Sequence, residues 1–446
     1  MTSLRRSLLL AAFVGGLAIG GAAQAVTADA AQNTLTIKPT PPAEAASAAH
    51  GEAATRVERG RYLAVLGDCT SCHTAKGGKP FAGGRPIDTG FGVVYGPNLT
   101  PDKETGIGNW SKDDFYRAVH HGRDDEDKYL YPAFPYPWFT KVTRSDVDAL
   151  KDYLASLPPV HQQNKPPEMH WWLSWRFELL GWNLLFFDPG EFKADPTKSA
   201  EWNRGAYLVT GLGHCGDCHS QKNYFGGVIG SETLAGGHTM GGHDKGWFAP
   251  SLRGEQRSGL GRWSIDDIVT YLKTGSNVRT AAAGPMTEAV IDSTSHFSDA
   301  DLKSVAIYLK SLPPRHEEKE ESGFTEAALD RQAVERGQGL FIDNCAACHM
   351  LDGNGLRNFF PALRASSAVQ ARDPATVIRI VLQGANVPAA AGQRSYIAMP
   401  AFGRKLDDRD VADVVNYIRN AWLNRGSTVD AGKVASERKA LANAKD

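Results

Sequence analysis

The chain has 446 residues, a formal net charge of −1 at pH 7 and a mean hydropathy of −0.34. The balanced charge argues against a nucleic-acid-binding protein, since no basic surplus would attract a phosphate backbone. The low hydropathy argues against a polytopic membrane protein. The chain is long enough for three domains of roughly 100 residues each.

Residues 1–25 have the order of a secretory signal peptide. Arg5 and Arg6 precede an apolar run from Leu8 to Ile19, and small residues follow it up to Ala25. The run is short for a membrane span and is interrupted by glycines. We therefore predict export with cleavage after Ala25, and a location on the periplasmic side of a bacterial inner membrane. Residues 26–54, rich in Ala, Thr and Pro, are predicted to be a flexible tether.

All six cysteines lie in three Cys-x-x-Cys-His pentapeptides, at residues 69–73, 215–219 and 345–349. This pattern is the attachment signature of c-type haem, in which two thiols form thioether bonds and the histidine lies under the iron. Disulfides, redox-active cysteine pairs and zinc sites are the alternatives, but none of them requires a histidine directly after the second cysteine. We predict three haem c groups. The covalent attachment residues are Cys69, Cys72, Cys215, Cys218, Cys345 and Cys348, and the proximal iron ligands are His73, His219 and His349.

Two landmarks flank every pentapeptide. An Arg-Gly pair opens a short helix ahead of it, and its glycine predicts close helix packing. A Pro-x-Leu tripeptide follows it, and a carbonyl near that proline is predicted to accept the hydrogen of the histidine Nδ1. The Arg-Gly pairs begin at Arg59, Arg204 and Arg336, and the tripeptides begin at Pro97, Pro250 and Pro361.

Further elements recur toward the end of each repeat. Residues 106–111 and 259–264 share a Gly-x-Gly-x-Trp-Ser pattern, whose serine is predicted to cap a helix together with an aspartate three residues on. A looser version occupies residues 376–382 of the third repeat. Each repeat then closes on an amphipathic helix that carries a tyrosine. The closing helices are predicted over 146–157, 299–312 and 407–422.

This order of helix, haem motif, loop and closing helix resembles the class I cytochrome c domain. The resemblance covers about residues 55–424 and implies an all-α fold of three tandem domains, each wrapped around one covalently attached haem. The implied divisions are cytochrome c domains at 55–160, 201–316 and 331–424, an aromatic linker at 161–200, a charged linker at 317–330 and a tail at 425–446.

Methionines in two repeats are placed to be the distal iron ligands. Met286 and Met399 lie between the Pro-x-Leu tripeptide and the closing helix of their repeats. Either side chain could instead fill a gap in the core. Met240 is a second candidate in the second repeat, although its glycine-rich setting favours a loop.

The first repeat lacks a methionine at this place. Aligning Ala133-Phe134-Pro135 with Ala398-Met399-Pro400 puts Phe134 where the ligand is expected. Phenylalanine cannot bind iron. The first haem is therefore five-coordinate, or it takes a ligand from His120, His121 or Met169.

The chain also resembles the tri-haem cytochrome subunit of bacterial membrane-bound dehydrogenases for alcohol, aldehyde, gluconate, sorbitol or fructose. The segments that carry this resemblance are 98–102, 106–108, 131–133 and 213–219. It implies an electron-transfer subunit that is not catalytic alone. Its partners would be a separate catalytic subunit of the flavin, quinone or molybdopterin type and ubiquinone in the membrane. A free periplasmic carrier that feeds an oxidase and a haem peroxidase are the alternatives.

Residues 170–187 hold four of the ten tryptophans. The segment is too short and too charged to span a membrane, but its composition suits a position at the membrane surface. The alternative is that these aromatic side chains pack between two haem domains. The acidic run 317–321 is predicted to be a solvated linker. No C-terminal anchor is expected from the residues after the third closing helix.

Overall fold

The computed structural model describes residues 42–173, 175–239, 246–315, 330–357, 359–386 and 398–443. The predicted signal peptide, residues 26–41 of the predicted tether, Met240 and residues 317–329 of the charged linker lie outside the described residues. Residues 51–446 form one compact unit. Its boundary lies inside the first described helix (Pro42–Leu66), so the three repeats share this unit.

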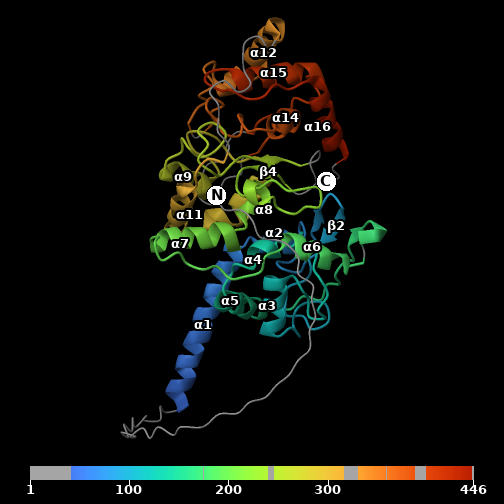
Figure 1. Cartoon of the computed structure of the whole chain (residues 1–446), viewed down its shortest axis with the longest axis vertical. Helices are drawn as coiled ribbons and strands as arrows, with labels where there is room; N and C mark the ends of the chain where they lie inside the picture. Colours follow the sequence, from blue (N-terminus) through green and yellow to red (C-terminus); the bar gives the residue numbers. More distant parts are fainter. Residues whose placement is uncertain are drawn as a thin grey trace, which may run out of the picture. The chain divides into compact units, whose positions relative to one another are not determined.

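Helices make up most of the described elements (Figure 1). The first repeat contains α1 (Pro42–Leu66), α2 (Cys69–His73), α3 (Lys112–His121), α4 (Tyr136–Phe139) and α5 (Arg144–Ala155). The aromatic linker contains η1 (Trp171–Leu173) and α6 (Glu178–Phe186). The second repeat contains α7 (Ala200–Tyr207), η2 (Leu208–Leu212), α8 (Cys215–His219), η3 (Gly230–Glu232), α9 (Ile265–Thr274), α10 (Pro285–Asp292), η4 (Thr294–His296) and α11 (Asp299–Ser311). The third contains α12 (Arg331–Asn344), α13 (Ala346–His349), α14 (Ala375–Gln383), α15 (Asp408–Asn420) and α16 (Ala431–Asn443).

Two small antiparallel sheets stand beside these helices, so the prediction of an all-α fold is confirmed only in part. The first contains β1 (Pro86–Asp88), β2 (Gly92–Tyr95) and β3 (Glu168–Met169), with Ile87 opposite Val94 and Val93 opposite Glu168. The second contains β4 (Gly237–His238) and β5 (Phe248–Ala249). Strands of two to four residues carry too little alternation to be recognised in a sequence.

Helix α1 corrects the predicted tether. It begins at Pro42 and therefore includes residues 42–54. Proline is favoured in the first turn of a helix, and the following residues are largely Ala and Glu, which have high helix propensity. A composition rich in alanine fits a flexible segment and a helix equally well. From Pro42 onward the chain forms the helix.

The glycine of each Arg-Gly pair lies directly against the closing helix of its repeat, as predicted. A Cβ atom at Gly60, Gly205 or Gly337 would clash with the backbone carbonyl of Ala149, Ser304 or Asp413 respectively. The two helices of each pair therefore cross in backbone contact, and only glycine permits this distance. Figure 1 shows two of these pairs, α7 beside α11 and α12 beside α15.

The arginine of each pair binds a buried aspartate on the same closing helix. The Nε atoms of Arg59 and Arg204 lie 2.7 Å from carboxylate oxygens of Asp146 and Asp301. In the third repeat Arg336 Nε lies 2.8 Å from Asp413. Asp146 and Asp301 stand three residues after the N-caps of their helices, whereas Asp413 stands one turn further along its helix.

The first and second repeats meet through equivalent residues. Tyr62 donates to Asp301 at 2.8 Å, and Tyr207 donates to Asp146 at 2.6 Å. Each tyrosine stands three residues after its repeat's arginine, so the contact is reciprocal. The apolar side chains of both repeats form a single core cluster that extends from Leu63 to Leu309.

The third repeat has a core cluster of its own, from Phe341 to Val434. The predicted tail contributes to it, because α16 buries Val434 and places Glu437 2.7 Å from Arg379 of α14. The tail is thus a structural part of the third repeat.

Candidate haem sites

Each predicted proximal histidine is oriented by the predicted carbonyl. The Nδ1 atoms of His73, His219 and His349 lie 2.9, 2.8 and 3.0 Å from the carbonyl oxygens of Pro97, Pro250 and Pro361. A hydrogen bond from Nδ1–H leaves Nε2 as the atom with a free lone pair. The same contact orients metal-bound histidines generally. All three repeats therefore present a histidine that is ready to bind iron.

Burial lowers the pKa of all three histidines, while the proline carbonyls act in the opposite direction. A lowered pKa keeps the imidazole neutral, and only the neutral form binds a metal ion. The lowered pKa and the hydrogen bond at Nδ1 thus favour the same form of each histidine, a neutral ring with a free lone pair on Nε2.

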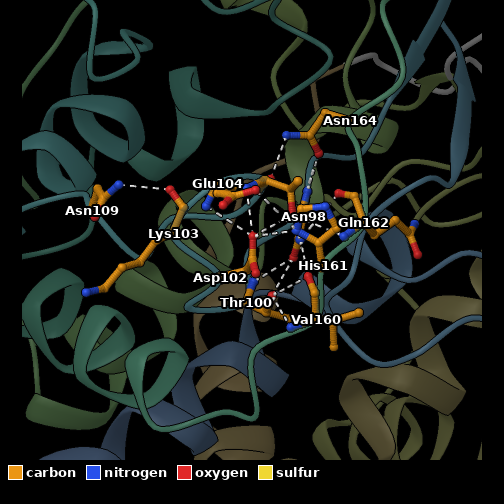
Figure 2. Close-up of polar contacts among 11 residues, drawn as sticks. Asn98, Thr100, Asp102, Lys103, Glu104, Asn109, Val160, His161, Gln162 and Asn164 are labelled. Atoms are coloured by element: carbon orange, nitrogen blue, oxygen red, sulfur yellow. Dashed lines mark hydrogen bonds and ion pairs between the residues drawn. The ribbon is translucent and has the colours of Figure 1, made fainter.

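A network of polar side chains holds the Pro97 turn in the first repeat (Figure 2). The backbone N–H of Asn98 donates to Asn164 Oδ1 at 2.7 Å, and Asn98 Nδ2 donates to the Val160 carbonyl at 2.7 Å. Thr100 Oγ1 donates to Asn98 Oδ1 at 2.7 Å. Residues 160–164, which follow the first closing helix, thereby fix the peptide next to the carbonyl that orients His73. Nothing in the sequence linked these two segments.

No disulfide joins any of the six cysteines, and burial raises the pKa of five of them. The pKa of Cys69 and Cys218 rises to about 12, and that of Cys72, Cys215 and Cys345 to about 11. Reactive Cys-x-x-Cys pairs instead have a lowered pKa. These cysteines therefore differ from reactive Cys-x-x-Cys pairs in the direction of their pKa shift.

One continuous cavity joins the second and third sites. Its lining includes His219 and Met286 of the second repeat and His349 and Met399 of the third. Each predicted pair of iron ligands thus faces the same apolar cavity as its own cysteines. A hydrophobic pocket with a histidine and a methionine suits haem c.

The first attachment helix lies against this cavity. Leu66 and Asp68, just before Cys69, are among its lining residues. Ser71 of α2 lies 3.2 Å from Asp292 of α10, the helix that carries Met286. Arg85 and Glu288 form an ion pair across the same contact at 2.7 Å.

Comparison with known proteins is consistent with these sites. Residues 57–158 and 334–422 match the cytochrome c family. The chain is 42% identical to the gluconate 2-dehydrogenase cytochrome c subunit of Pantoea cypripedii, with 86% of this chain and 89% of that protein covered. It is 40% identical to the cytochrome c subunit of the quinone-type alcohol dehydrogenase of Gluconobacter oxydans, over 88% and 84% of the two chains. The cytochrome subunit of the fructose dehydrogenase of Gluconobacter japonicus is 32% identical, over 86% and 82%.

The chain belongs to the cytochrome c subunits of dehydrogenase complexes. The resemblance read from its sequence is thereby confirmed. Members of the cytochrome c family bind haem c, which agrees with the histidines, thiols and apolar cavity described above.

The distal segments of this cytochrome can be matched through their backbone pairing. Gly122 and Gly275 directly follow α3 and α9, and both have a left-handed backbone. The next residue pairs with Tyr129 in the first repeat and with Ala281 in the second. Five residues after these partners stand Phe134 and Met286, which are therefore equivalent.

The third repeat is arranged differently. There Met399 is itself the residue that pairs with Ala385 after the end of α14. This pairing relates Phe134 to Met286 directly, and the alignment of Phe134 with Met399 stays an expectation from the sequence. Residues 387–397, which precede Met399, lie outside the described residues.

The aromatic linker is divided between packed and exposed side chains. Trp182 Nε1 donates to the Phe225 carbonyl at 2.9 Å, and the Tyr136 hydroxyl donates to Asn183 at 2.7 Å, so α6 touches both flanking repeats. Other side chains face outward. The exposed apolar residues, which we call the aromatic patch, are Trp171, Trp175, Phe177, Leu180, Leu184 and Leu185. Within the described part of the chain, no helix combines the length and hydrophobicity that a membrane span needs.

Proposed function

We propose that this cytochrome carries three haem c groups and passes electrons from a periplasmic dehydrogenase catalytic subunit to ubiquinone. The observation that supports the count is an arrangement that recurs three times, in which the histidine after a cysteine pair has its Nδ1 on the carbonyl oxygen of a downstream proline. Haem c supplies a one-electron carrier when bound. The protein attaches it, supplies the proximal ligand and excludes water.

The second site lies between the other two in this proposal. It shares its cavity with the third site, and its α10 contacts the first attachment helix. Met286 and Met399 are the proposed distal ligands of the second and third haems. Three closely spaced haems would let electrons pass from one to the next along the chain. This role requires no catalytic group in the chain itself.

The proposed electron donor is a separate catalytic subunit of the flavin, quinone or molybdopterin type. Similarity to cytochrome subunits of gluconate, alcohol and fructose dehydrogenases supports a partner of this kind. The attachment of haem to exposed thiols favours export before folding, because burial would otherwise keep the thiols protonated. We therefore place the protein on the periplasmic side of the inner membrane, exported by the signal peptide at residues 1–25.

The aromatic patch is the proposed contact with the membrane surface, where ubiquinone would be reached. The exposed fractions of Trp171, Leu184 and Leu185 are 76%, 77% and 76%. Tryptophan favours the boundary between lipid headgroups and acyl chains, and leucine favours the acyl region. A soluble surface rarely gathers so many large apolar side chains on one short segment.

The function can be tested on the native complex. The full chain, tagged at its C-terminus and expressed in a host that matures c-type cytochromes, should have an intact mass with three covalent haems and should co-purify with a catalytic subunit. Substrate of that subunit should reduce all the haems, and ubiquinone-1 should reoxidise them. Isolation of the chain without any dehydrogenase subunit, or haems that ubiquinone-1 does not oxidise, would contradict the proposal.

The membrane contact can be tested with phosphatidylcholine vesicles. The variant Trp171→Ser/Trp175→Ser/Leu184→Ser/Leu185→Ser should float at least tenfold less with vesicles than the parent protein does. Leu351→Ser/Leu423→Ser is the matched control, since both leucines are more than 60% exposed but belong to the third repeat. Equal flotation of the patch variant and the control would count against the patch.

A further inference from the structure

The first repeat lacks a distal ligand at the place where the second repeat has one. Backbone pairing after α3 and α9 makes Phe134 equivalent to Met286, and a phenyl ring has no lone pair to give to iron. We propose that the first haem keeps an open coordination position, which binds small neutral ligands such as carbon monoxide. This inference rests on the proposed attachment of a haem at residues 69–73.

The other side chains of this distal segment are engaged elsewhere. The hydroxyl of Tyr131 donates to the Leu173 carbonyl at 3.0 Å, and that of Tyr136 donates to Asn183 at 2.7 Å. A tyrosine has one hydrogen to donate, so neither hydroxyl is available to a ligand on iron. Phe134 itself packs on Phe139, with ring centroids 5.4 Å apart.

Two histidines near this segment occupy positions whose equivalents in the second repeat do not line the cavity. Counting from the capping residues Ser111 and Ser264, His120 corresponds to Lys273 and His121 to Thr274. The α9 side chains that line the cavity are those of Ile268, Tyr271 and Leu272. The equivalent positions in α3 are the apolar Phe115, Ala118 and Val119.

The contacts of His120, His121 and Met169 bear on this assignment of cavity-lining positions. The His120 ring stacks on Tyr116 at 4.7 Å, and its Nδ1 lies 3.4 Å from Thr140 Oγ1. His121 lies edge-on to the same Tyr116 ring at 6.2 Å. Met169 belongs to β3, where it pairs with Gly92 of β2. His121 and Met169 therefore have neighbours outside the distal segment, whereas His120 keeps a buried Nε2 without a hydrogen-bond partner among the described residues and is the ligand that the His120→Ala variant has to test.

The side chains beside Phe134 favour a neutral ligand on the first haem. Phe134 and Phe139 offer no hydrogen-bond donor, and an anion buried beside them would lose its hydration without compensation. Donors in the distal pocket are also what stabilises bound oxygen. Carbon monoxide needs neither charge compensation nor a donor, so it is the ligand that this open position fits.

The test is a carbon monoxide titration of the full chain after its haem content has been measured. The reduced protein should bind one carbon monoxide for every three haems, and the oxidised protein should contain one high-spin iron by electron paramagnetic resonance. Phe134→Met should abolish both signals. Met286→Phe should double them, and Phe134→Leu, the matched control, should keep one of each.

Each contrary result has a distinct meaning. Three haems with no carbon monoxide binding would overturn this inference and leave the proposed function intact. Binding that appears only in His120→Ala, His121→Ala or Met169→Leu would identify that residue as the sixth ligand and would likewise overturn it. A haem count of two, with Cys69 and Cys72 unmodified, would instead overturn the proposed haem count.

Discussion

The contact between the first and second repeats differs in kind from that between the second and third. Tyr62 and Tyr207 bind Asp301 and Asp146 reciprocally, and one core cluster runs through both repeats. The third repeat has Gly339 where these tyrosines stand, and a Cβ atom there would meet only open space. A duplicated domain can pair with its copy through equivalent residues, but a third copy has to find other contacts.

The contacts of the third repeat are indeed unrelated to those of the first two. Thr376 Oγ1 donates to the Phe248 carbonyl at 2.8 Å, and Trp263 Nε1 donates to Ser367 at 3.2 Å. Helix α16 then completes a separate core. We infer that the third repeat unfolds independently of the fused pair, and the following changes test this difference.

The largest effect is expected from Glu437→Gln. Arg379 and Glu437 are 3% and 1% exposed, and breaking a buried ion pair costs about 3–5 kcal/mol. Guanidinium unfolding should show two transitions, of which only that of the third repeat moves to lower denaturant. Lys433→Gln is the control, since this lysine also contacts Glu437 but is 30% exposed. A single transition that shifts as a whole would show that the repeats are not independent.

The next largest loss of stability is expected at the glycine that contacts the closing helix in every repeat. Gly337→Ala should destabilise the third repeat by about 1–3 kcal/mol, because the added methyl group would clash with the Asp413 carbonyl. Gly339→Ala, two residues along the same helix, meets no atom within 4 Å and should stabilise it slightly. The free energy of unfolding of the two variants is the measurement. Equal effects would contradict the backbone contact.

The reciprocal contact can be broken from either side. Tyr62→Phe and Tyr207→Phe each remove one hydrogen bond to a buried carboxylate, at an expected cost of about 1.5–3 kcal/mol. Both should shift the transition of the fused pair and leave that of the third repeat in place. Tyr308→Phe is the control, because the Tyr308 hydroxyl has no hydrogen bond within the described ranges. A shift in the third repeat's transition would contradict the independent unfolding of that repeat.

The smallest effect concerns pH. Burial alone would raise the pKa of Asp373, but the hydrogen bonds from His238 and the Ala375 N–H and the charge of Lys433 lower it to about 2. A carboxyl with a lowered pKa stabilises the folded state above its unfolded pKa of about 4 and loses this contribution as the pH falls toward 2. We expect a loss of about 1–2 kcal/mol in the third repeat's transition between pH 4 and pH 2. In Asp373→Asn, the free energy of unfolding of the third repeat should change less between pH 4 and pH 2 than in the parent protein. An equal change in both proteins would contradict the assignment to Asp373.

The sequence by itself indicated the haem-attachment motifs and the internal repetition. The Cys-x-x-Cys-His motifs, the Pro-x-Leu tripeptides and the Arg-Gly pairs are local, and the chemistry of each is set by residues within a few positions. The orienting carbonyls and the close glycine packing were predicted for this reason. The structure bears out both.

Only the tertiary structure decided how the repeats are joined. Asp146 and Asp301 read as ordinary first-turn residues until Tyr207 and Tyr62 are seen to reach them from the neighbouring repeat. The equivalence of Phe134 with Met286 likewise depends on backbone pairing across a loop of variable length. Such relations join residues far apart in the chain, and they form only when burial makes an unpaired polar group costly.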